Sequence, residues 1–66
     1  MKPEHFKYER GAVLRKKAGS EWVGRVVGFY STEQMPEGYA LESIYHKNTV
    51  QIYPVQALIR VDRLQD

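Results

Sequence analysis

The sequence predicts an all-β fold, specifically a small five-stranded SH3-like barrel, and three observations lead to this prediction. Short segments rich in Val, Ile, Tyr, Phe and Trp follow one another and are separated by Gly, Pro and Asn turn signals. Glycines within the apolar stretches, Gly24 and Gly28, disfavour a helix. A Val-Gln-Ala-Leu segment before the last apolar stretch is too short for a stable helix and fits a single 3₁₀ turn, as in SH3-like barrels.

The expected elements follow in order along one domain. The strands are expected at 13–17, 22–30, 39–43, 50–53 and 59–62, with the 3₁₀ turn at 55–58. The connections carry turn residues: Ala18-Gly19-Ser20, the Pro- and Gly-containing loop 31–38, and Lys47-Asn48. Residues 1–11 are expected to form a short N-terminal arm, and residues 12–66 the barrel domain.

The third expected strand alternates clearly. Tyr39, Leu41 and Ser43 fall on one face, and Ala40 and Glu42 fall on the other. This period of two predicts a strand with one buried face.

The fourth expected strand, which ends at Pro54, permits two interpretations. It places Gln51 and Tyr53 on one face and Val50 and Ile52 on the other. It is either a half-buried strand with two polar groups facing water, or a binding surface. Gln supplies both a donor and an acceptor, and Tyr supplies a flat ring with a hydroxyl.

The size of the chain predicts self-association. A core of 66 residues rarely supplies more than about 3–5 kcal/mol. There is no Cys, and the two histidines, His5 and His46, are too far apart to suggest a metal pair. The net charge of +2 is too small for a nucleic-acid tail. Neither a membrane-length apolar run nor a signal-peptide pattern is found, so a soluble cytoplasmic protein is expected.

Conventional catalytic machinery is not indicated by the residues themselves. Ser20, Ser31 and Ser43 have no obvious triad partners. Glu42 is the carboxylate nearest to apolar residues, and alternation turns it to the polar face. The glycine spacing matches no phosphate-binding loop. The residue chemistry alone therefore favours a binding module.

Two further features have both a structural and a functional interpretation. Arg15, Lys16 and Lys17 form either a solvated strand end or a contact for phosphate or carboxylate groups. Trp22, the only Trp, is either a core residue or the centre of a subunit interface.

Several blocks, in order from about Gly11 to Val61, resemble the type II (B-type) dihydrofolate reductases. The Val50–Val55 block, which contains VQIYP, is the most distinctive. The others are Arg15–Gly19, Trp22, Gly24, Val27-Gly28, Tyr30, Pro36–Ala40, Glu42-Ser43, His46 and Ala57-Leu58.

The resemblance implies a 222-symmetric homotetramer with a single active-site pore. Gln51, Ile52 and Tyr53 would line the pore four times over and bind both ligands, NADPH and dihydrofolate. Hydride would pass directly between them, and the proton would come from solvent rather than from a side-chain acid. Such a site would be insensitive to trimethoprim.

The resemblance also implies further residue roles. Lys16 would attract both anionic ligands at the pore mouths, and Thr49 and Val50 would contact the cofactor. Trp22, Ser43 and His46 would lie at subunit interfaces. We hypothesise that protonation of His46 in acid splits the tetramer into dimers, which sedimentation at acidic and alkaline pH would test.

Some positions depart from the family pattern. Phe29 stands where Trp is common, and His46-Lys47-Asn48 replaces a His-Pro-Gly turn. Ser20-Glu21 replaces two small residues, and Glu21 adds negative charge that partly offsets Lys16. The alternative function is a non-catalytic SH3-like module that binds a peptide or nucleic acid.

Overall fold

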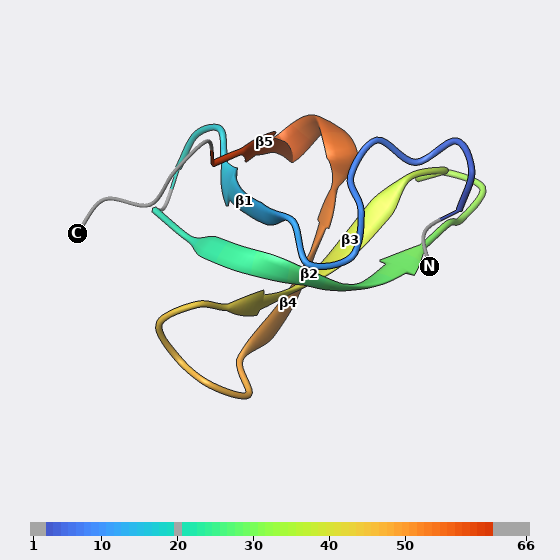
Figure 1. Ribbon diagram of the computed structural model, residues 1–66. Coiled ribbons are helices and arrows are strands. Elements are labelled where there is room, and N and C mark those ends of the chain that lie inside the picture. Colours follow the sequence, from blue (N-terminus) through green and yellow to red (C-terminus); the bar gives the residue numbers. More distant parts are fainter. Residues whose placement is uncertain (1–2, 20, 62–66) are drawn as a thin grey trace.

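The computed structural model describes residues 3–19 and 21–61, which form one antiparallel sheet of five strands (Figure 1). The sheet order is β4-β3-β2-β1-β5, and the 3₁₀ turn η1 joins β4 to β5. The elements are β1 (Val13–Lys16), β2 (Val23–Tyr30), β3 (Gly38–Ser43), β4 (Val50–Pro54), η1 (Val55–Ala57) and β5 (Leu58–Arg60). The all-β class and the five strands are therefore confirmed. In the described part of the chain, no helix is long and apolar enough to cross a bilayer.

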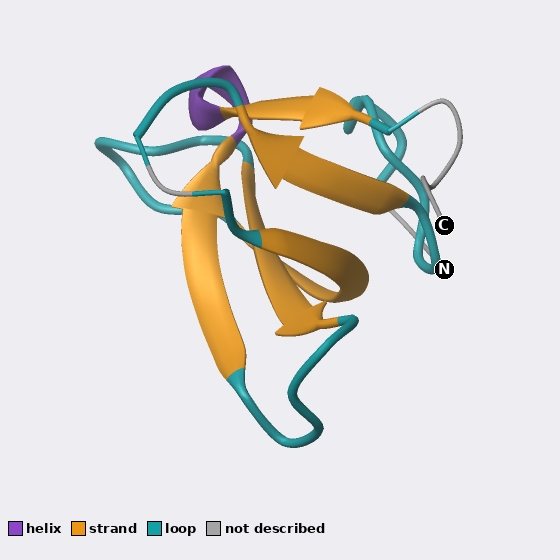
Figure 2. Cartoon of the chain, turned by 90° about the vertical axis from the view of Figure 1, so that its left-hand side faces the viewer, coloured by secondary structure: helices purple, strands orange, loops and turns teal. Residues whose placement is uncertain are grey.

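The expectation of a closed barrel is wrong for this chain by itself. Among the described residues, β4 pairs with β3 and β5 pairs with β1, so β4 and β5 are the two edges of an open sheet. The three-residue β5 follows directly after η1, which leaves it little length for a second ladder. The sheet is nevertheless strongly curled (Figure 2).

The curl of the sheet is accompanied by a bulge in β2. The pairing of β2 with β3 shifts register between Val26 and Gly28. On the other side of β2, two backbone hydrogen bonds extend the pairing of β1 with β2 towards the N-terminus. The Gly11 N–H donates to the Val26 carbonyl, and the Val26 N–H donates to the Ala12 carbonyl, both at 2.9 Å. A bulge increases the local bend and twist of a strand, so the two sides of the sheet face each other across a core.

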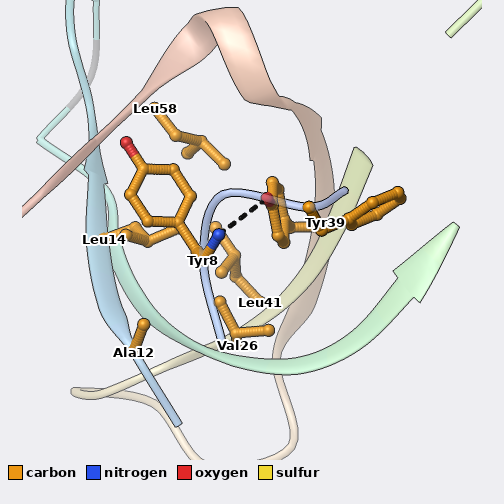
Figure 3. Close-up of a cluster of buried hydrophobic side chains, with 8 residues drawn as sticks. Tyr8, Ala12, Leu14, Val26, Tyr39, Leu41 and Leu58 are labelled. Atoms are coloured by element: carbon orange, nitrogen blue, oxygen red, sulfur yellow. Dashed lines mark hydrogen bonds between the residues drawn. The ribbon is translucent and has the colours of Figure 1, made fainter. Parts of the chain in front are cut away.

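The core lies inside this curl and follows the predicted alternation of β3 (Figure 3). Tyr39 and Leu41 are fully buried and Ser43 is nearly so. Leu14 from β1, Val26 from β2 and Leu58 from β5 complete the centre. The predicted end of the last strand at Asp62, like Ser20 in the first turn, lies outside the described residues.

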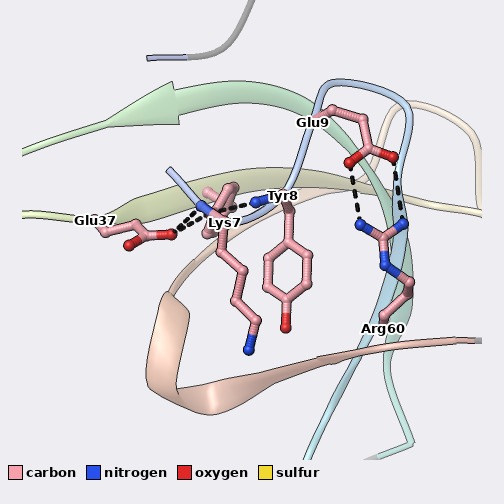
Figure 4. Close-up of polar contacts among 6 residues, drawn as sticks. Lys7, Tyr8, Glu9, Glu37 and Arg60 are labelled. Atoms are coloured by element: carbon pink, nitrogen blue, oxygen red, sulfur yellow. Dashed lines mark hydrogen bonds and ion pairs between the residues drawn. The ribbon is translucent and has the colours of Figure 1, made fainter. Parts of the chain in front are cut away.

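The N-terminal segment, set apart from the barrel in the sequence-based division, packs on this core. Phe6 and Tyr8 are only 3% and 4% exposed, and both rings meet Tyr39 edge to face. The segment is also held by an ion pair between Glu9 and Arg60 at 3.0 Å (Figure 4). Two aromatic residues among charged neighbours gave only a weak amphipathic signal, although both are buried.

A polar network joins this segment to the start of β3. The Glu37 carboxylate accepts hydrogen bonds from the Lys7 amide at 2.8 Å and from the Tyr39 hydroxyl, and that hydroxyl accepts from the Tyr8 amide at 3.0 Å (Figure 4). Burial, together with the bond to Glu37, raises the pKa of Tyr39 to about 12. At Glu37, burial opposes ionisation, but the hydrogen bonds outweigh it and lower the pKa.

Alkaline pH should therefore weaken the fold through Tyr39. The neutral phenol is favoured in the folded state, so its contribution is complete below pH 10.0, the ordinary pKa, and is lost as the pH rises towards 12. Tyr39→Phe should lower the free energy of unfolding at neutral pH by about 1–3 kcal/mol, because the buried Tyr8 amide loses its acceptor. Urea unfolding from neutral to strongly alkaline pH measures both effects.

Tyr45→Phe is the matched control, because Tyr45 is largely exposed. It should keep the wild-type alkaline profile, whereas Tyr39→Phe should flatten it. Identical profiles for wild type and Tyr39→Phe would rule out this role of the hydroxyl.

Candidate functional site

Strand β4 presents side chains to solvent on both of its faces. A half-buried strand would cover Val50 and Ile52, but these are 51% and 62% exposed. Gln51 is also exposed, and only Tyr53 and Pro54 are partly covered. Large apolar side chains left in water on a short strand indicate a surface that is covered by a ligand or by another chain.

Strand β4 is also an edge strand. Its described ladder runs from the pair Glu42–Val50 to the pair Gly38–Pro54, all with β3. At an edge, alternate residues direct their backbone N–H and C=O groups away from the sheet. The edge of β4 can therefore bond a group that carries both a donor and an acceptor, such as a carboxamide.

The predicted common face of Gln51 and Tyr53 is confirmed. The Tyr53 hydroxyl donates a hydrogen bond to the Gln51 carbonyl oxygen Oε1. This contact fixes the orientation of the amide and leaves the Gln51 NH₂ group available as a donor. An amide and a phenol ring thus sit side by side at the exposed strand.

Lys16 and Trp22 gather around the same tyrosine from the other side of the curled sheet. The Lys16 ammonium lies 5.1 Å from the Tyr53 ring centroid, and the Trp22 and Tyr53 centroids are 5.8 Å apart. We call Lys16, Trp22, Gln51 and Tyr53 the β4 cluster. It brings together three of the predicted ligand-binding residues and one predicted interface residue.

The position of Trp22 depends on Gly24. A Cβ atom built at Gly24 would lie 2.5 Å from the indole, 2.9 Å from the Glu42 carbonyl oxygen and 2.9 Å from the Leu41 Cβ. The indole can therefore lie over β2 only because this residue lacks a side chain.

A groove adjoins the β4 cluster at Lys16. It runs beside the β1–β2 turn and reaches the β3–β4 loop, and its described lining is Arg15, Lys16, Lys17, Ala18, Gly19, Glu21, Val23 and Tyr45. Three cations face one carboxylate there, so the groove favours anions. Glu21 does share a groove with Lys16, as the sequence-based charge argument requires. Tyr45 was missed from the sequence, where only its aromatic character within a turn could have marked it.

The β3–β4 loop holds the remaining predicted residues. The Ser43 hydroxyl oxygen accepts hydrogen bonds from the amides of Tyr45 and His46, both at 3.0 Å, and the Ser43 amide donates to the Thr49 carbonyl at 2.8 Å. Ser43 therefore closes the loop from within the chain, while His46 and Thr49 are exposed. An interface role for Trp22, Ser43 and His46 remains a prediction.

The tip of this loop is stabilised by Asn48. Its φ of 66° lies in the left-handed region, which Asn tolerates better than most residues. The backbone N–H of Asn48 donates to the Glu42 carboxylate at 2.9 Å. The Lys47-Asn48 turn expected from the sequence is thus built by an Asn where a Gly would serve equally well.

The β4 cluster can bind and orient a ligand through an amide, an aromatic ring and a cation. The contacts described for Tyr53 are with an amide, an ammonium group and an indole, none of which is a carboxylic acid. The two described groups with shifted pKa values, Glu37 and Tyr39, hydrogen-bond to the N-terminal segment instead.

Comparison with known proteins fits this arrangement. Residues 2–62 match the model of the R67 dihydrofolate reductase family. The chain belongs to this family. A dihydrofolate reductase type 2 of Escherichia coli is 54% identical over 59 residues, which cover 89% of this chain and 76% of the relative. Another Escherichia coli protein of the same name is 48% identical over 60 residues, covering 91% and 77%.

Membership in the R67 dihydrofolate reductase family confirms the resemblance found in the sequence. It also confirms that the chain is an enzyme, a dihydrofolate reductase, and hence an oxidoreductase. The non-catalytic SH3-like module is correspondingly disfavoured.

Proposed function

We propose that the chain reduces dihydrofolate to tetrahydrofolate with NADPH, in a single pore shared by four copies of the chain. The β4 cluster carries this proposal, because it combines an oriented amide, an aromatic ring and a cation beside an exposed strand edge. Family membership supplies the substrate class. The sequence motif VQIYP corresponds to the whole of β4.

Gln51, Ile52 and Tyr53 are the residues proposed to hold the reacting rings. Gln51 offers its NH₂ group as a donor, and its carbonyl oxygen keeps a second acceptor position beside the bond from Tyr53. Ile52 offers an exposed side chain as an apolar surface and backbone groups on an edge strand. In a symmetric pore each copy serves either ligand, which requires groups that both donate and accept, as an amide and a peptide backbone do.

The donor set fits NADPH as the cofactor. A nicotinamide carboxamide matches the edge of β4, and cofactor phosphates match the Lys16 ammonium and the cationic groove beside it. Thr49 and Val50, at the start of β4, are exposed and extend this surface. When bound, the cofactor supplies a hydride to C6 of the pteridine, and NADP⁺ is formed.

The proton at N5 is proposed to come from water. The contacts described for the β4 cluster include no carboxylic acid, so the protein contributes mainly proximity and orientation. Such a pore would differ in shape from the active-site cleft of the chromosomal dihydrofolate reductases. Trimethoprim is therefore expected to bind the pore poorly.

The 222-symmetric tetramer of SH3-like subunits is part of this proposal. Val50, Ile52 and Ile59 leave apolar surface in water, and a chain of this size gains stability when such surface is covered. Trp22, Ser43 and His46 are the proposed interface residues. In this assembly, the β4 clusters of all four copies would line the same pore.

The direct test is an assay of NADPH-dependent dihydrofolate reduction, with and without excess trimethoprim. The loss of NADPH absorbance should require dihydrofolate and should persist when trimethoprim is present. An assembled protein without activity would refute the proposal and would favour a binding role for the same surface.

Replacing Lys16 by methionine tests the cationic contribution. The substitution should weaken binding of both anionic ligands and flatten the salt dependence of their dissociation constants, since exposed charges act through screened attraction. Isothermal titration at several ionic strengths measures this. Lys7→Met removes the same charge from the N-terminal segment, where the ammonium lies over the Tyr8 ring, and should keep the wild-type salt dependence. Equal slopes for the two variants would exclude the role of Lys16.

A further inference from the structure

The groove beside Lys16 has one wall formed by an aromatic side chain. Tyr45 is 67% exposed, the highest value among the exposed large apolar and aromatic residues described. It lines the same groove as Arg15 and Lys16 at the end of β1 and Lys17 at the start of the following turn. Tyr is enriched at binding interfaces, because its ring is apolar and its hydroxyl is polar.

The backbone that carries this ring is well fixed. The Tyr45 amide donates to the Ser43 hydroxyl at 3.0 Å, and the neighbouring Ile44 amide donates to the Val23 carbonyl at 3.2 Å. Ser43 is nearly buried, so it anchors the loop to the sheet. The ring therefore sits on a fixed base, which reduces the entropy lost when a ligand stacks on it.

The groove is continuous with the proposed active site through Lys16. The Lys16 side chain lines the groove and also lies over the Tyr53 ring of the β4 cluster. Its ammonium is close to Gly19, where an added Cβ would be 3.5 Å away. A ligand held at the β4 cluster can thus extend past Lys16 into the groove.

We propose that Tyr45, with Arg15 and Lys17, forms an outer subsite that binds an aromatic ring bearing an anionic group. The ring stacks on Tyr45, and the anion meets the two cations. The identity of the ligand rests on the proposed function, because NADPH and dihydrofolate each end in an aromatic ring that carries an anionic group. One end is an adenosine with a 2′-phosphate, and the other is an aminobenzoyl group with a glutamate.

Glu21 sets the strength of this subsite. It is exposed and is the one carboxylate in the described lining, facing three cations. Its charge offsets part of their field, so Glu21→Gln should tighten binding of an anionic fragment about twofold to fivefold.

Fragment titrations on the full-length chain test the subsite. The probes are 2′,5′-ADP and p-aminobenzoyl-glutamate, followed by NMR or calorimetry on wild type, Tyr45→Ala and Tyr45→Phe. Tyr45→Ala should weaken binding of a fragment that uses the subsite about fivefold to tenfold, and Tyr45→Phe should keep the wild-type affinity, because only the ring is needed. Arg15→Gln should weaken the same fragment.

The two probes separate the two ends. A loss confined to 2′,5′-ADP assigns the subsite to the cofactor, a loss confined to p-aminobenzoyl-glutamate assigns it to the substrate, and a loss of both makes it shared. Unchanged affinity of both fragments in Tyr45→Ala overturns the inference. Because the titrations do not depend on turnover, absent reductase activity would refute the proposed function while leaving this result to be judged separately.

Discussion

Gln51→Ala is expected to lower kcat/KM for dihydrofolate reduction about fivefold to 150-fold. The substitution removes an oriented amide from every copy of the β4 cluster, and two ligands lose a partner in each productive complex. Each hydrogen bond contributes about 0.5–1.5 kcal/mol, so two together give a loss of this size. Steady-state kinetics with both ligands varied measures it.

Gln34→Ala is the matched control, since Gln34 is an exposed amide in the β2–β3 loop. It should leave kcat/KM unchanged. Tyr53→Phe should give an intermediate loss, because the Gln51 amide survives but is no longer held by the Tyr53 hydroxyl. Wild-type kinetics for Gln51→Ala would mean that β4 does not hold the reacting rings.

Gly24→Ala is expected to lower both stability and ligand affinity. The added methyl would meet the Trp22 indole at 2.5 Å and the fixed Glu42 carbonyl oxygen at 2.9 Å, and the backbone cannot yield as a side chain can. Overpacking of this kind costs about 1–3 kcal/mol. Displacement of Trp22 would also disturb Tyr53, against which it packs. Urea unfolding and NADPH titration report the two effects.

Gly28→Ala in the same strand provides the comparison. A Cβ there would lie 3.5 Å from the Ala40 Cβ, which is an ordinary contact. This variant should unfold close to wild type and bind NADPH normally. If Gly24→Ala were as stable as Gly28→Ala, the close packing of Trp22 on β2 could not be important.

The strands were predicted well from local patterns, because the alternation of side chains along a strand depends on residues that are close in the sequence. The alternation of Tyr39, Leu41 and Ser43 identified the buried face of β3, and the pairing of Gln51 with Tyr53 on one face of β4 was also visible. Closure of the sheet was predicted incorrectly. It depends on whether β4 and β5, which are separated only by η1, reach each other in space.

Contacts between distant segments were harder to anticipate. Phe6 and Tyr8 stand among charged residues, so their burial against Tyr39 has no periodic signature. The approach of Lys16 to Tyr53 joins two strands that are not neighbours in the sheet. The family resemblance singled out Lys16 and Tyr53 as ligand-binding residues, but it gave no indication of Tyr45.

The most direct test of a shared pore is the stoichiometry of ligand binding to the assembled protein. Calorimetric titration with NADPH and a non-reacting folate, on a sample of known oligomeric state, counts productive complexes per chain. The account predicts a single ternary complex for every four chains, because all four β4 strands build one site. One ternary complex per chain would contradict it and would place a complete active site within each subunit.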